Sequence, residues 1–438
     1  MYKAPSLSTK FQILSLLFLL SNPPKTTSSH TPPHLTPNVN PLHQNESYIL
    51  PPQAPPPLPS LIPSDFIDIK VYLAYQVIQQ FKSNITSDPL GITQTWVGPD
   101  VCTTYKGFYC ANPPYNTSAT TLAAIDFNGY GLGAPSITDF LAQLPDLAFF
   151  HANSNKFRGT ISASAVSNLS FLYELDVSNN LMSGPFPAAV LSISNLNFLD
   201  LRFNSFSGSI PPQLFTLKLE ELFINDNDFT QPLPVNLWKS PVNYITLANN
   251  RFVGGIPCGV GSAAETLVEV LLLNNELTGC LPYEVGLLGI ATVFDAGNNR
   301  LTGPIPESMG CMGRVEQLNL AGNHLYGHVP ESVCRIGSLV NLSLSDNYFT
   351  SVGPTCMQLI EKGVMDDRKN CIRGRPMQRS PAECIEFFLK KKYHCPLSFY
   401  YYYYSPCHHS HYSRSHARAR PPPPPPSPSY SALNRHRL

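Results

Sequence analysis

The sequence predicts an α/β solenoid of about ten stacked repeats, with disulfide-stapled caps and disordered Pro-rich ends. Three observations support this fold class. A residue pattern recurs every 23 to 25 residues, cysteines flank the repeated region, and prolines concentrate near both ends of the chain. The 438 residues are ample for two or three domain-sized units with a substantial core.

The repeated unit follows the pattern L-x-x-L-x-L-x-x-N-x-L-x-G-x-I-P, of which LYELDVSNNLMSGPFP and LNFLDLRFNSFSGSIP are clear copies. Successive units begin at Leu122, Leu147, Leu172, Leu196, Leu219, Val242, Leu267, Ala291, Val315 and Leu339. A period of about 20 to 29 residues with this spacing is the leucine-rich repeat signature. We therefore predict a horseshoe whose apolar positions 1, 4, 6 and 11 point inward, where stacking of neighbouring units buries them.

Position 9 of the unit is an asparagine, which we predict to be structural. The residues concerned are Asn155, Asn180, Asn204, Asn227, Asn250, Asn275, Asn299, Asn323 and Asn347, and the first unit has Tyr130 instead. A buried amide can both donate to and accept from the backbone of adjacent turns. Function should therefore depend on the side chains that the scaffold displays.

The segments around the repeats are assigned from their composition. Two lysines precede the apolar stretch FQILSLLFLL, which is the layout of a secretory signal peptide and too short to span a bilayer. No other stretch is long and apolar enough for a membrane span. The predicted domains are a signal peptide at 1–28, a Pro-rich linker at 29–63, an N-terminal cap at 64–121, the repeats at 122–360, a Cys-containing C-terminal cap or hinge at 361–398 and a Tyr/His/Pro-rich tail at 399–438.

The N-terminal cap is expected to begin with an amphipathic helix, because apolar residues from Phe66 to Phe81 recur at helical spacing. Its expected buried face is Phe66, Ile69, Leu73, Val77 and Phe81. Ser64 or Asp65 is the expected N-cap.

The side chains displayed by the strands are mostly acidic and aromatic. In each unit, positions 3, 5, 7 and 8 should face outward on the concave side, and across the units they hold nine acidic residues against one base, Arg202. The candidate peptide-binding residues on this face are Phe149, His151, Glu174, Asp176, Phe198, Asp200, Phe203, Glu221, Phe223, Asp226, Tyr244 and Glu269. Clustered aromatic side chains often anchor an interface.

Three interpretations of this face remain open. The acids are simply solvated, the face binds a basic polypeptide that is steered to it by charge, or the chain's own basic end folds back over it. The third follows from the charge distribution, since residues 1–359 carry a net charge of −9 and residues 360–438 one of +9. The zero overall balance argues against a nucleic-acid partner.

The eleven cysteines predict an oxidising compartment and terminal disulfides. We expect Cys102 to pair with Cys110 beside the first coil, Cys258 with Cys280 in adjacent coils, and Cys334 with Cys356 at the last coil. An odd total leaves at least one thiol without an internal partner, and Cys311 or Cys407 is the expected one.

Export would also permit glycosylation. N-x-S/T sequons occur at Asn45, Asn84, Asn116, Asn168 and Asn341. The tail contains five consecutive tyrosines, Tyr400 to Tyr404, which motivate a hypothesis of oxidative coupling, and a His-rich patch that we interpret as solvated and not as a metal site. The sequence predicts no cofactor.

Several motifs resemble those of the leucine-rich repeat extensin family of plant cell walls. They are the plant-type L-x-G-x-I-P ending, the TWVGPDVC and GFYC segments, and DDRKNC, GRP and QRSPAEC after the last repeat. The resemblance runs from about Ser64 to Cys395. It implies a secreted, wall-located protein that binds rapid alkalinisation factor peptides, which are small, basic and Cys-rich, regulates wall formation and growth, contacts wall polymers and forms disulfide-linked dimers.

The chain departs from this family pattern in three ways. The extensin-like tail is short and lacks repeated Ser-Pro blocks, Arg158 and Gly255 stand where the family often has cysteine, and Cys311 is additional. Two alternatives to peptide binding are inhibition of microbial polygalacturonase in defence, as in inhibitors with similar repeats, and a purely structural role in the wall. No catalytic motif is present in the sequence, so we predict that the protein is not an enzyme.

Overall fold

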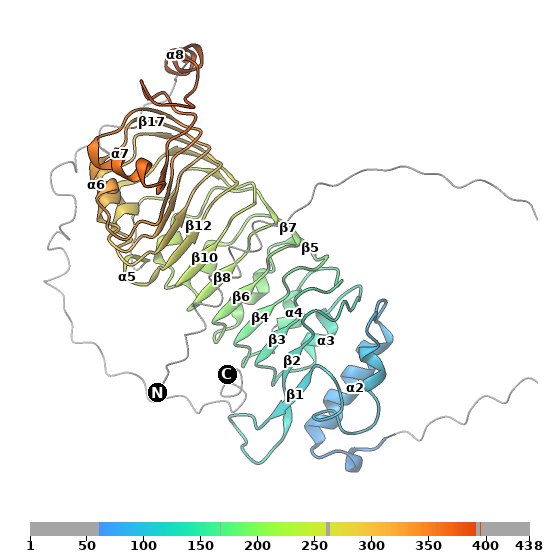
Figure 1. Cartoon of the computed structure of the whole chain (residues 1–438). Helices are drawn as coiled ribbons and strands as arrows, with labels where there is room; N and C mark the ends of the chain where they lie inside the picture. The colour runs from blue at the N-terminus through green and yellow to red at the C-terminus, as the bar shows by residue number, and fades with distance from the viewer. Residues whose placement is uncertain (1–60, 167, 260–262, 391–394, 396–438) are drawn as a thin grey trace, which may run out of the picture. The chain divides into compact units, whose positions relative to one another are not determined.

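The computed structural model describes residues 61–166, 168–259, 263–390 and 395, which fall within one compact unit, Ser60–Leu438. This unit is a solenoid of stacked coils, as predicted (Figure 1). The predicted signal peptide, nearly all of the Pro-rich linker, the sequon at Asn45, Cys407 and the Tyr/His/Pro-rich tail lie outside the described residues.

One twelve-stranded sheet runs through the solenoid, with one strand from each coil. Its strands are, in spatial order, β1 (Phe108–Ala111), β2 (Thr121–Asp126), β3 (Phe149–His151), β4 (Glu174–Asp176), β6 (Phe198–Asp200), β8 (Glu221–Phe223), β10 (Tyr244–Thr246), β12 (Glu269–Leu271), β14 (Val293–Asp295), β16 (Gln317–Asn319), β18 (Asn341–Ser343) and β20 (Met365–Asp366). β1 pairs antiparallel with β2, and every later pair is parallel. We call the outward side of this sheet the sheet face; it is the predicted concave side.

Two smaller parallel sheets lie along the flank, built from the segments that follow position 9. One contains β5 (Ser183–Pro185), β7 (Ser205–Gly208) and β9 (Asp228–Phe229), and the other β11 (Val253–Gly254), β13 (Glu276–Cys280), β15 (Arg300–Gly303), β17 (His324–His328) and β19 (Tyr348–Ser351). Most of these strands end at or next to the glycine of the repeat, as β7 ends at Gly208 and β15 at Gly303.

Helical turns complete the coils. The α-helices are α2 (Ile69–Ser83), α3 (Thr138–Ala142), α4 (Ala163–Val166), α5 (Ala263–Thr266), α6 (Glu331–Cys334), α7 (Pro354–Glu361) and α8 (Pro381–Lys390). The 3-10 turns are η1 (Pro63–Asp65), η2 (Ile92–Thr95), η3 (Ala188–Ser192), η4 (Pro212–Thr216), η5 (Leu237–Lys239), η6 (Tyr283–Leu287) and η7 (Glu307–Cys311). The main hydrophobic core extends from α2 to the last coils, because each coil buries its inward leucines only against its neighbours.

The position-9 asparagines join each coil to the one before it. Asn227 is typical: its Nδ2 donates to the carbonyl of Leu201 in the preceding coil at 2.9 Å and to the carbonyl of Ile224 in its own coil at 3.2 Å. Its Oδ1 accepts from the backbone N–H of Phe206 at 2.9 Å. The amide is buried and fully used, so the prediction of a structural role for this position is supported by its contacts.

The same ladder continues one coil beyond the repeats assigned from the sequence. Asn370 is fully buried, donates to the carbonyl of Leu344 at 3.0 Å and accepts from the backbone N–H of Phe349 at 3.0 Å. β20 pairs with β18 as the next strand of the sheet. The DDRKNC motif is therefore an eleventh coil, and its asparagine follows Asn347 at the usual repeat spacing.

The N-terminal cap covers the open end of the core with α2 and β1. The carboxylate of Asp68 caps the helix by accepting from the backbone N–H of Lys70 at 2.9 Å, and its other oxygen accepts from Thr120 N–H at 2.9 Å. The helix therefore starts later than Ser64 or Asp65 would place it. Its buried face is Val71, Ala74, Val77, Ile78 and Phe81, whereas the expected core residues Ile69 and Leu73 are exposed.

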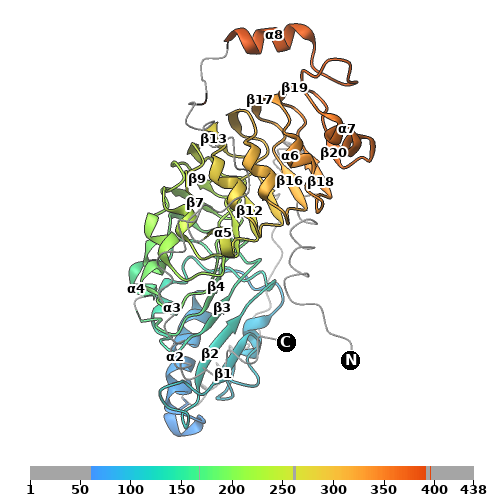
Figure 2. The ribbon, with the colours of Figure 1, turned by 90° about the vertical axis from the view of Figure 1, so that its left-hand side faces the viewer.

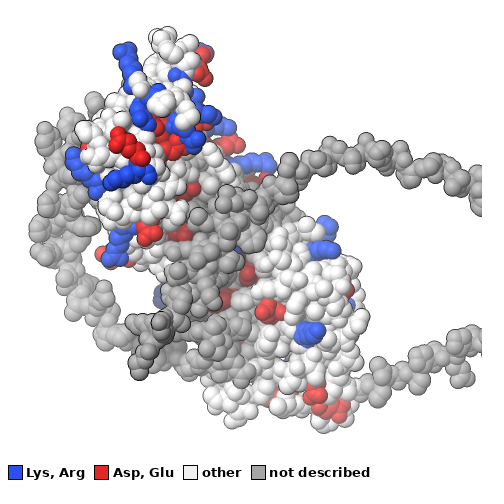
Figure 3. Space-filling view, in the orientation of Figure 1, with Lys and Arg blue, Asp and Glu red and all other residues white. Residues whose placement is uncertain are grey.

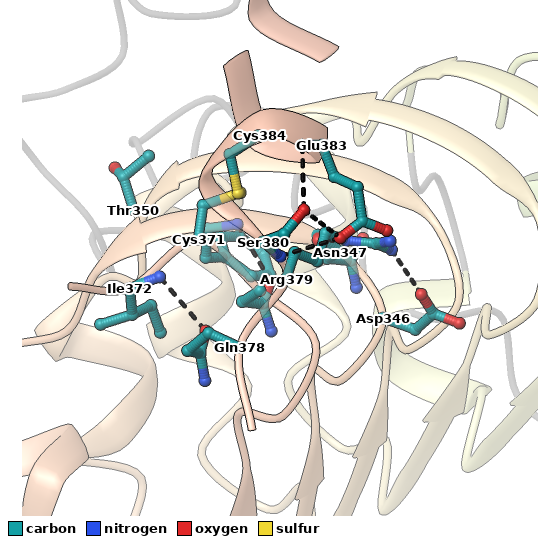
Figure 4. Close-up of a disulfide and its surroundings, with 12 residues drawn as sticks. Asp346, Asn347, Thr350, Cys371, Ile372, Gln378, Arg379, Ser380, Glu383 and Cys384 are labelled. Atoms are coloured by element: carbon teal, nitrogen blue, oxygen red, sulfur yellow. Dashed lines mark hydrogen bonds and ion pairs between the residues drawn. A yellow bond between two sulfur atoms is a disulfide. The ribbon is translucent and has the colours of Figure 1, made fainter. Parts of the chain in front are cut away.

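The C-terminal cap is held by arginine and by a disulfide (Figure 4). Arg379, from the QRSPAEC motif, donates to the carbonyl of Asn347 at 2.8 Å, pairs with Asp346 and lies 4.3 Å over the ring of Tyr348. Cys371 pairs with Cys384 on α8. Phe387 of α8 stacks on Tyr348 with ring centroids 3.6 Å apart. Together these contacts fasten α8 beyond the last coils (Figure 2).

The disulfides correct part of the sequence-based map. The structure pairs Cys102 with Cys110 and Cys334 with Cys356, which are the terminal pairs expected from the sequence. The expected Cys258–Cys280 pair is wrong, because Cys280 pairs with Cys395 and Cys258 is a free, exposed thiol.

The sequence missed this pairing because its two partners are 115 residues apart. The approach of Cys395 depends on Gly303, where a Cβ atom would lie 2.1 Å from the Cys395 sulfur. Cys311 is also disulfide-bonded, so the expectation that it is the unpaired thiol is wrong as well.

Candidate functional site: the sheet face

The register of the sheet arranges the outward side chains in straight rows. Position-3 residues pair directly across neighbouring strands, and so do position-5 residues. The position-3 row reads, from β3 to β18, Phe149, Glu174, Phe198, Glu221, Tyr244, Glu269, Val293, Gln317 and Asn341. From β4 to β12, acids and aromatic rings therefore alternate one for one. We call Glu174, Phe198, Glu221, Tyr244 and Glu269 the alternating row.

Two carboxylates of this row have no bonded partner in the described part of the chain. Glu221 and Glu269 form neither an ion pair nor a hydrogen bond there. Burial, together with the nearby charges of Glu174 and Glu220, raises the pKa of Glu221 to about 7. Burial alone raises the pKa of Glu269. The charge of Arg202 acts on Glu221 in the opposite direction, but no cation of the described residues forms an ion pair with Glu221 or Glu269, so a ligand can supply one.

The third carboxylate, Glu174, pairs with histidine. Its Oε2 lies 2.8 Å from Nε2 of His151. Burial lowers the pKa of His151, but the hydrogen bond with Glu174 and the charges of Glu174, Asp176 and Asp126 outweigh burial, so the pKa is raised. This pair forms the N-terminal end of the acidic region.

Arg202 and Asp200 form an internal pair in the position-5 and position-7 rows. Asp200 is 0% exposed and accepts from Nη2 of Arg202 at 2.6 Å and from its Nε at 2.9 Å. Burial and the neighbouring Asp176 outweigh this partner and raise the pKa of Asp200 to about 6. The guanidinium also lies 4.7 Å over the ring of Phe223. The prediction that Asp200 binds the ligand is wrong, because its carboxylate is buried and already paired with Arg202.

Contrary to expectation, two of the aromatic candidates are not exposed side chains of a strand. Phe149 is 2% exposed and packs with Ala123, Ala124 and Ala148 in a small cluster on the sheet face, so it cannot serve as an exposed anchor. Phe203 is 42% exposed but lies after its strand, in the turn at position 8. Its φ of 52° is left-handed, a conformation that the other described units give to Gly129, Ser154, Asn179, Asp226, Asn249, Asn274, Asn298, Gly322, Asp346 and Lys369.

The left-handed Phe203 is costly, because a side chain without a local hydrogen-bonding group loses about 1 kcal/mol or more in this conformation. Asparagine, aspartate and glycine tolerate it better. The exposed phenyl ring lies at the edge of the sheet face, where a ligand can reach it.

The remaining candidate carboxylates have partners within the fold. Asp176 accepts from the backbone N–H and hydroxyl of Ser178 at 2.8 and 2.6 Å. Asp226 accepts from the side-chain amides of Asn225 and Asn249 at 2.7 and 2.9 Å. These two acids orient turns, which leaves Glu221 and Glu269 as the carboxylates best placed to bind a cation.

The described sequons are all on the surface. Asn84, Asn116, Asn168 and Asn341 are exposed. Asn341 is at position 3 of β18, on the sheet face itself. A glycan there would occupy the C-terminal part of the face and leave the alternating row open.

Other kinds of site find little support in the described residues. They contain no group of three or more His, Cys, Asp or Glu residues arranged to hold a metal ion. No helix among them has the length and apolar character needed to cross a membrane. A hollow of about 800 Å³ lies at the end of the solenoid between α8 and the last coil, lined by residues such as Val352, Met357, Ile372, Ile385 and Phe388. It is separate from the alternating row.

The fold and the asparagine ladder define a leucine-rich repeat protein. The Leucine Rich Repeat family model matches residues 195–217. Among solved structures, the chain is similar to a plant ice-binding protein, with a TM-score of 0.57, 21% identity and coverage of 71% of this chain and 98% of that one.

The chain is also similar to the ectodomain of the receptor kinase GASSHO1/SCHENGEN3 from Arabidopsis thaliana, solved in complex with CASPARIAN STRIP INTEGRITY FACTOR 2. The TM-score is 0.52 and the identity 23%, over 69% of this chain and 44% of that one. At these identities the likenesses establish the fold.

Curated relatives identify the family more narrowly. The chain is 42% identical over 375 residues to leucine-rich repeat extensin-like protein 6 of Arabidopsis thaliana, which covers 85% of this chain and 74% of the relative. Leucine-rich repeat extensin-like proteins 2 and 4 of the same plant are 41% and 44% identical, over 51% and 50% of this chain. The chain belongs to the leucine-rich repeat extensin-like family. It spans only 28% and 41% of the length of the last two relatives.

Proposed function

We propose that this chain is an extracellular cell-wall protein whose sheet face binds a basic, Cys-rich signalling peptide of the rapid alkalinisation factor type, and that it thereby regulates wall formation and growth. The observation that carries the proposal is the pair of half-buried carboxylates Glu221 and Glu269, which form no ion pair or hydrogen bond among the described residues and lie on either side of the Tyr244 ring. A basic side chain would satisfy both groups, and the rings would contact the ligand's apolar parts.

The compartment and the role fit this proposal. The described disulfides are those of an oxidising, extracellular environment. The family membership adds the wall location and the peptide class as expectations. The role we propose is binding, in which the carboxylates of Glu221 and Glu269 pair with cations of the ligand.

Titration calorimetry of the full chain with a basic Cys-rich peptide, at low and high salt, tests the proposal. We expect binding that weakens with salt and that Glu221→Gln reduces at least several-fold. Glu316→Gln is the matched control, because Glu316 is an exposed acid of the coil of β16, outside the row. Absence of binding at both salt concentrations, or equal affinities for the two variants, contradicts the proposal. Inhibition of a polygalacturonase without peptide binding would favour the defence function.

We also propose that the chain forms disulfide-linked dimers and that Cys258 provides the bond. Cys258 is the free cysteine among the described residues and is exposed. Nonreducing electrophoresis of the secreted protein should show a dimer that Cys258→Ser removes. A dimer that persists in the variant would contradict this role of Cys258.

A further inference from the structure

The alternating row has a regular spacing that the proposed function does not use. Glu174, Glu221 and Glu269 lie on every second strand, and the intervening strands place Phe198 and Tyr244 between them in direct register. Because neighbouring strands are about 4.8 Å apart, the acidic positions recur about every 9.6 Å and span about 19 Å in total.

A ligand can match this spacing only if its basic side chains recur at the same interval and on one side. A polyproline II segment rises about 3.1 Å per residue with three residues per turn, so every third side chain returns to the same face after about 9.3 Å. Over the two intervals of the row, the mismatch is only about 0.6 Å.

The other regular conformations fit less well. In an extended strand, side chains three residues apart are separated by about 10 Å but point to opposite faces. In an α-helix, side chains seven residues apart share a face but are separated by about 10.5 Å, which gives a mismatch of about 1.8 Å over the row. The row therefore favours polyproline II over both.

The aromatic residues fit the same ligand. Between two basic residues, a polyproline II segment places two residues over the intervening strand, where Phe198 and Tyr244 are half-buried and partly accessible. Grooves lined with aromatic side chains are a recurrent way of binding proline-rich segments. The rings of Phe198 and Phe223 pack against each other with their centroids 5.7 Å apart, and this contact holds the Phe198 ring in place.

The row also has defined ends, and these set the length of the ligand. On the N-terminal side, the position-3 residue is the buried Phe149, and on the C-terminal side it is the uncharged Val293. Three basic residues in about seven ligand residues would fill the interval from Glu174 to Glu269.

We propose that the alternating row binds a polyproline II segment that carries a basic side chain at every third residue, with proline or apolar residues between them. This inference rests on the proposed function, because it assigns a conformation and a spacing to the part of the cationic ligand that contacts the sheet face. The partner is a peptide whose charges lie opposite the three glutamates, of which Glu174 already pairs with His151, whereas Glu221 and Glu269 form no ion pair among the described residues.

Two synthetic peptides of identical composition test the inference. One is a Pro-Pro-Arg repeat with four arginines, and the other has the same residues with its arginines separated alternately by one and by three prolines. Fluorescence anisotropy with the full chain at physiological salt should show the regular peptide binding about tenfold more tightly. Glu269→Gln should reduce that preference, and Glu316→Gln, an exposed acid of the coil of β16, should leave it unchanged.

The possible outcomes separate the two proposals. Equal affinities of the two peptides overturn the spacing inference and leave the proposed function standing. If neither peptide binds while the basic Cys-rich peptide does, the spacing inference is again overturned. If none of the three binds, both proposals fail. The comparison of peptides on the unmodified protein does not depend on the folding of any variant.

Discussion

The two parts of the sheet face share one scaffold and differ in what they display. From β4 to β12, position 3 alternates between glutamate and an aromatic ring, whereas from β14 to β18 it holds Val293, Gln317 and Asn341. The asparagine ladder beneath is the same, as Asn227 and Asn323 make equivalent hydrogen bonds. We infer that the repeated residues determine the fold, and that function depends on the positions that vary between repeats.

Charge separates the ends of the molecule as well. Figure 3 shows Lys and Arg side chains gathered around the C-terminal coils and α8, whereas the N-terminal coils are mostly uncharged on the side shown. In the C-terminal cap several of these cations are paired, as in Arg368–Asp366, Arg375–Asp367 and Arg379–Asp346. Glu221 and Glu269, which form no ion pair among the described residues, lie on the other part of the solenoid.

The largest expected effect concerns the scaffold that both parts share. Asn227→Ala and Asn323→Ala should each lower the free energy of unfolding by about 3 kcal/mol, because each leaves buried backbone groups of two coils without partners. Urea unfolding followed by circular dichroism measures both. A loss below about 1 kcal/mol at either site would show that the two parts are not held in the same way.

The next largest effect should be on peptide binding, and it should differ between the two parts of the sheet face. Glu221→Lys should weaken binding of a basic peptide about 100-fold, since it replaces a half-buried carboxylate by a like charge beside the ligand. Gln317→Lys places the same charge at position 3 of β16 and should change affinity little. Calorimetry that finds equal losses for the two variants would mean that charge anywhere on the face matters and that the alternating row has no special role.

Peptide affinity and stability should both depend on pH through Glu221. Because the pKa of Glu221 is about 7 in the folded protein and 4.5 ordinarily, peptide affinity should rise between pH 5 and pH 8 as this carboxylate ionises. The folded state binds the proton more tightly than the unfolded state, so the free energy of unfolding should fall as pH rises from about 4.5 to about 7. Both trends should flatten in Glu221→Gln, and an unchanged pH profile in that variant would refute the assignment.

The smallest effect concerns the left-handed turn. Phe203→Asn should raise the free energy of unfolding by about 1 kcal/mol, because asparagine tolerates the φ of 52° better. The same variant should weaken peptide binding a few-fold. Asn298→Phe, the reverse change at position 8 of the β14 coil, should destabilise by a similar amount and leave binding unaltered. If Phe203→Asn is more stable and binds the peptide with full affinity, Phe203 is not part of the binding site.

The fold was largely predictable because its determinants recur in the sequence. Inward leucines and position-9 asparagines repeat at a nearly constant interval, so each unit supports the assignment of the next. The eleventh coil was missed because its Asn370 lies within a Cys-containing motif, although the interval from Asn347 fits the repeat. The Cys280–Cys395 bond joins segments that spacing cannot relate.

The site was only partly predictable, because strand alternation says which side chains leave the core and not which are satisfied outside it. Asp200 and Glu221 look alike in the sequence, yet one is buried against Arg202 and the other has no partner among the described residues. Phe149 and Phe198 share position 3, but Phe149 is buried in its alanine cluster. The alternation of acid and ring at position 3 was visible in the sequence once positions were compared separately.

Photo-crosslinking is the most direct test of the claim that ligand binding depends on the alternating row. A basic Cys-rich peptide carrying a photoreactive side chain is bound to the full chain, irradiated, and its attachment points are identified by mass spectrometry. We expect attachment within 173–271, on the strands from β4 to β12. Attachment confined to 293–343 or to the hollow beneath α8 would contradict it.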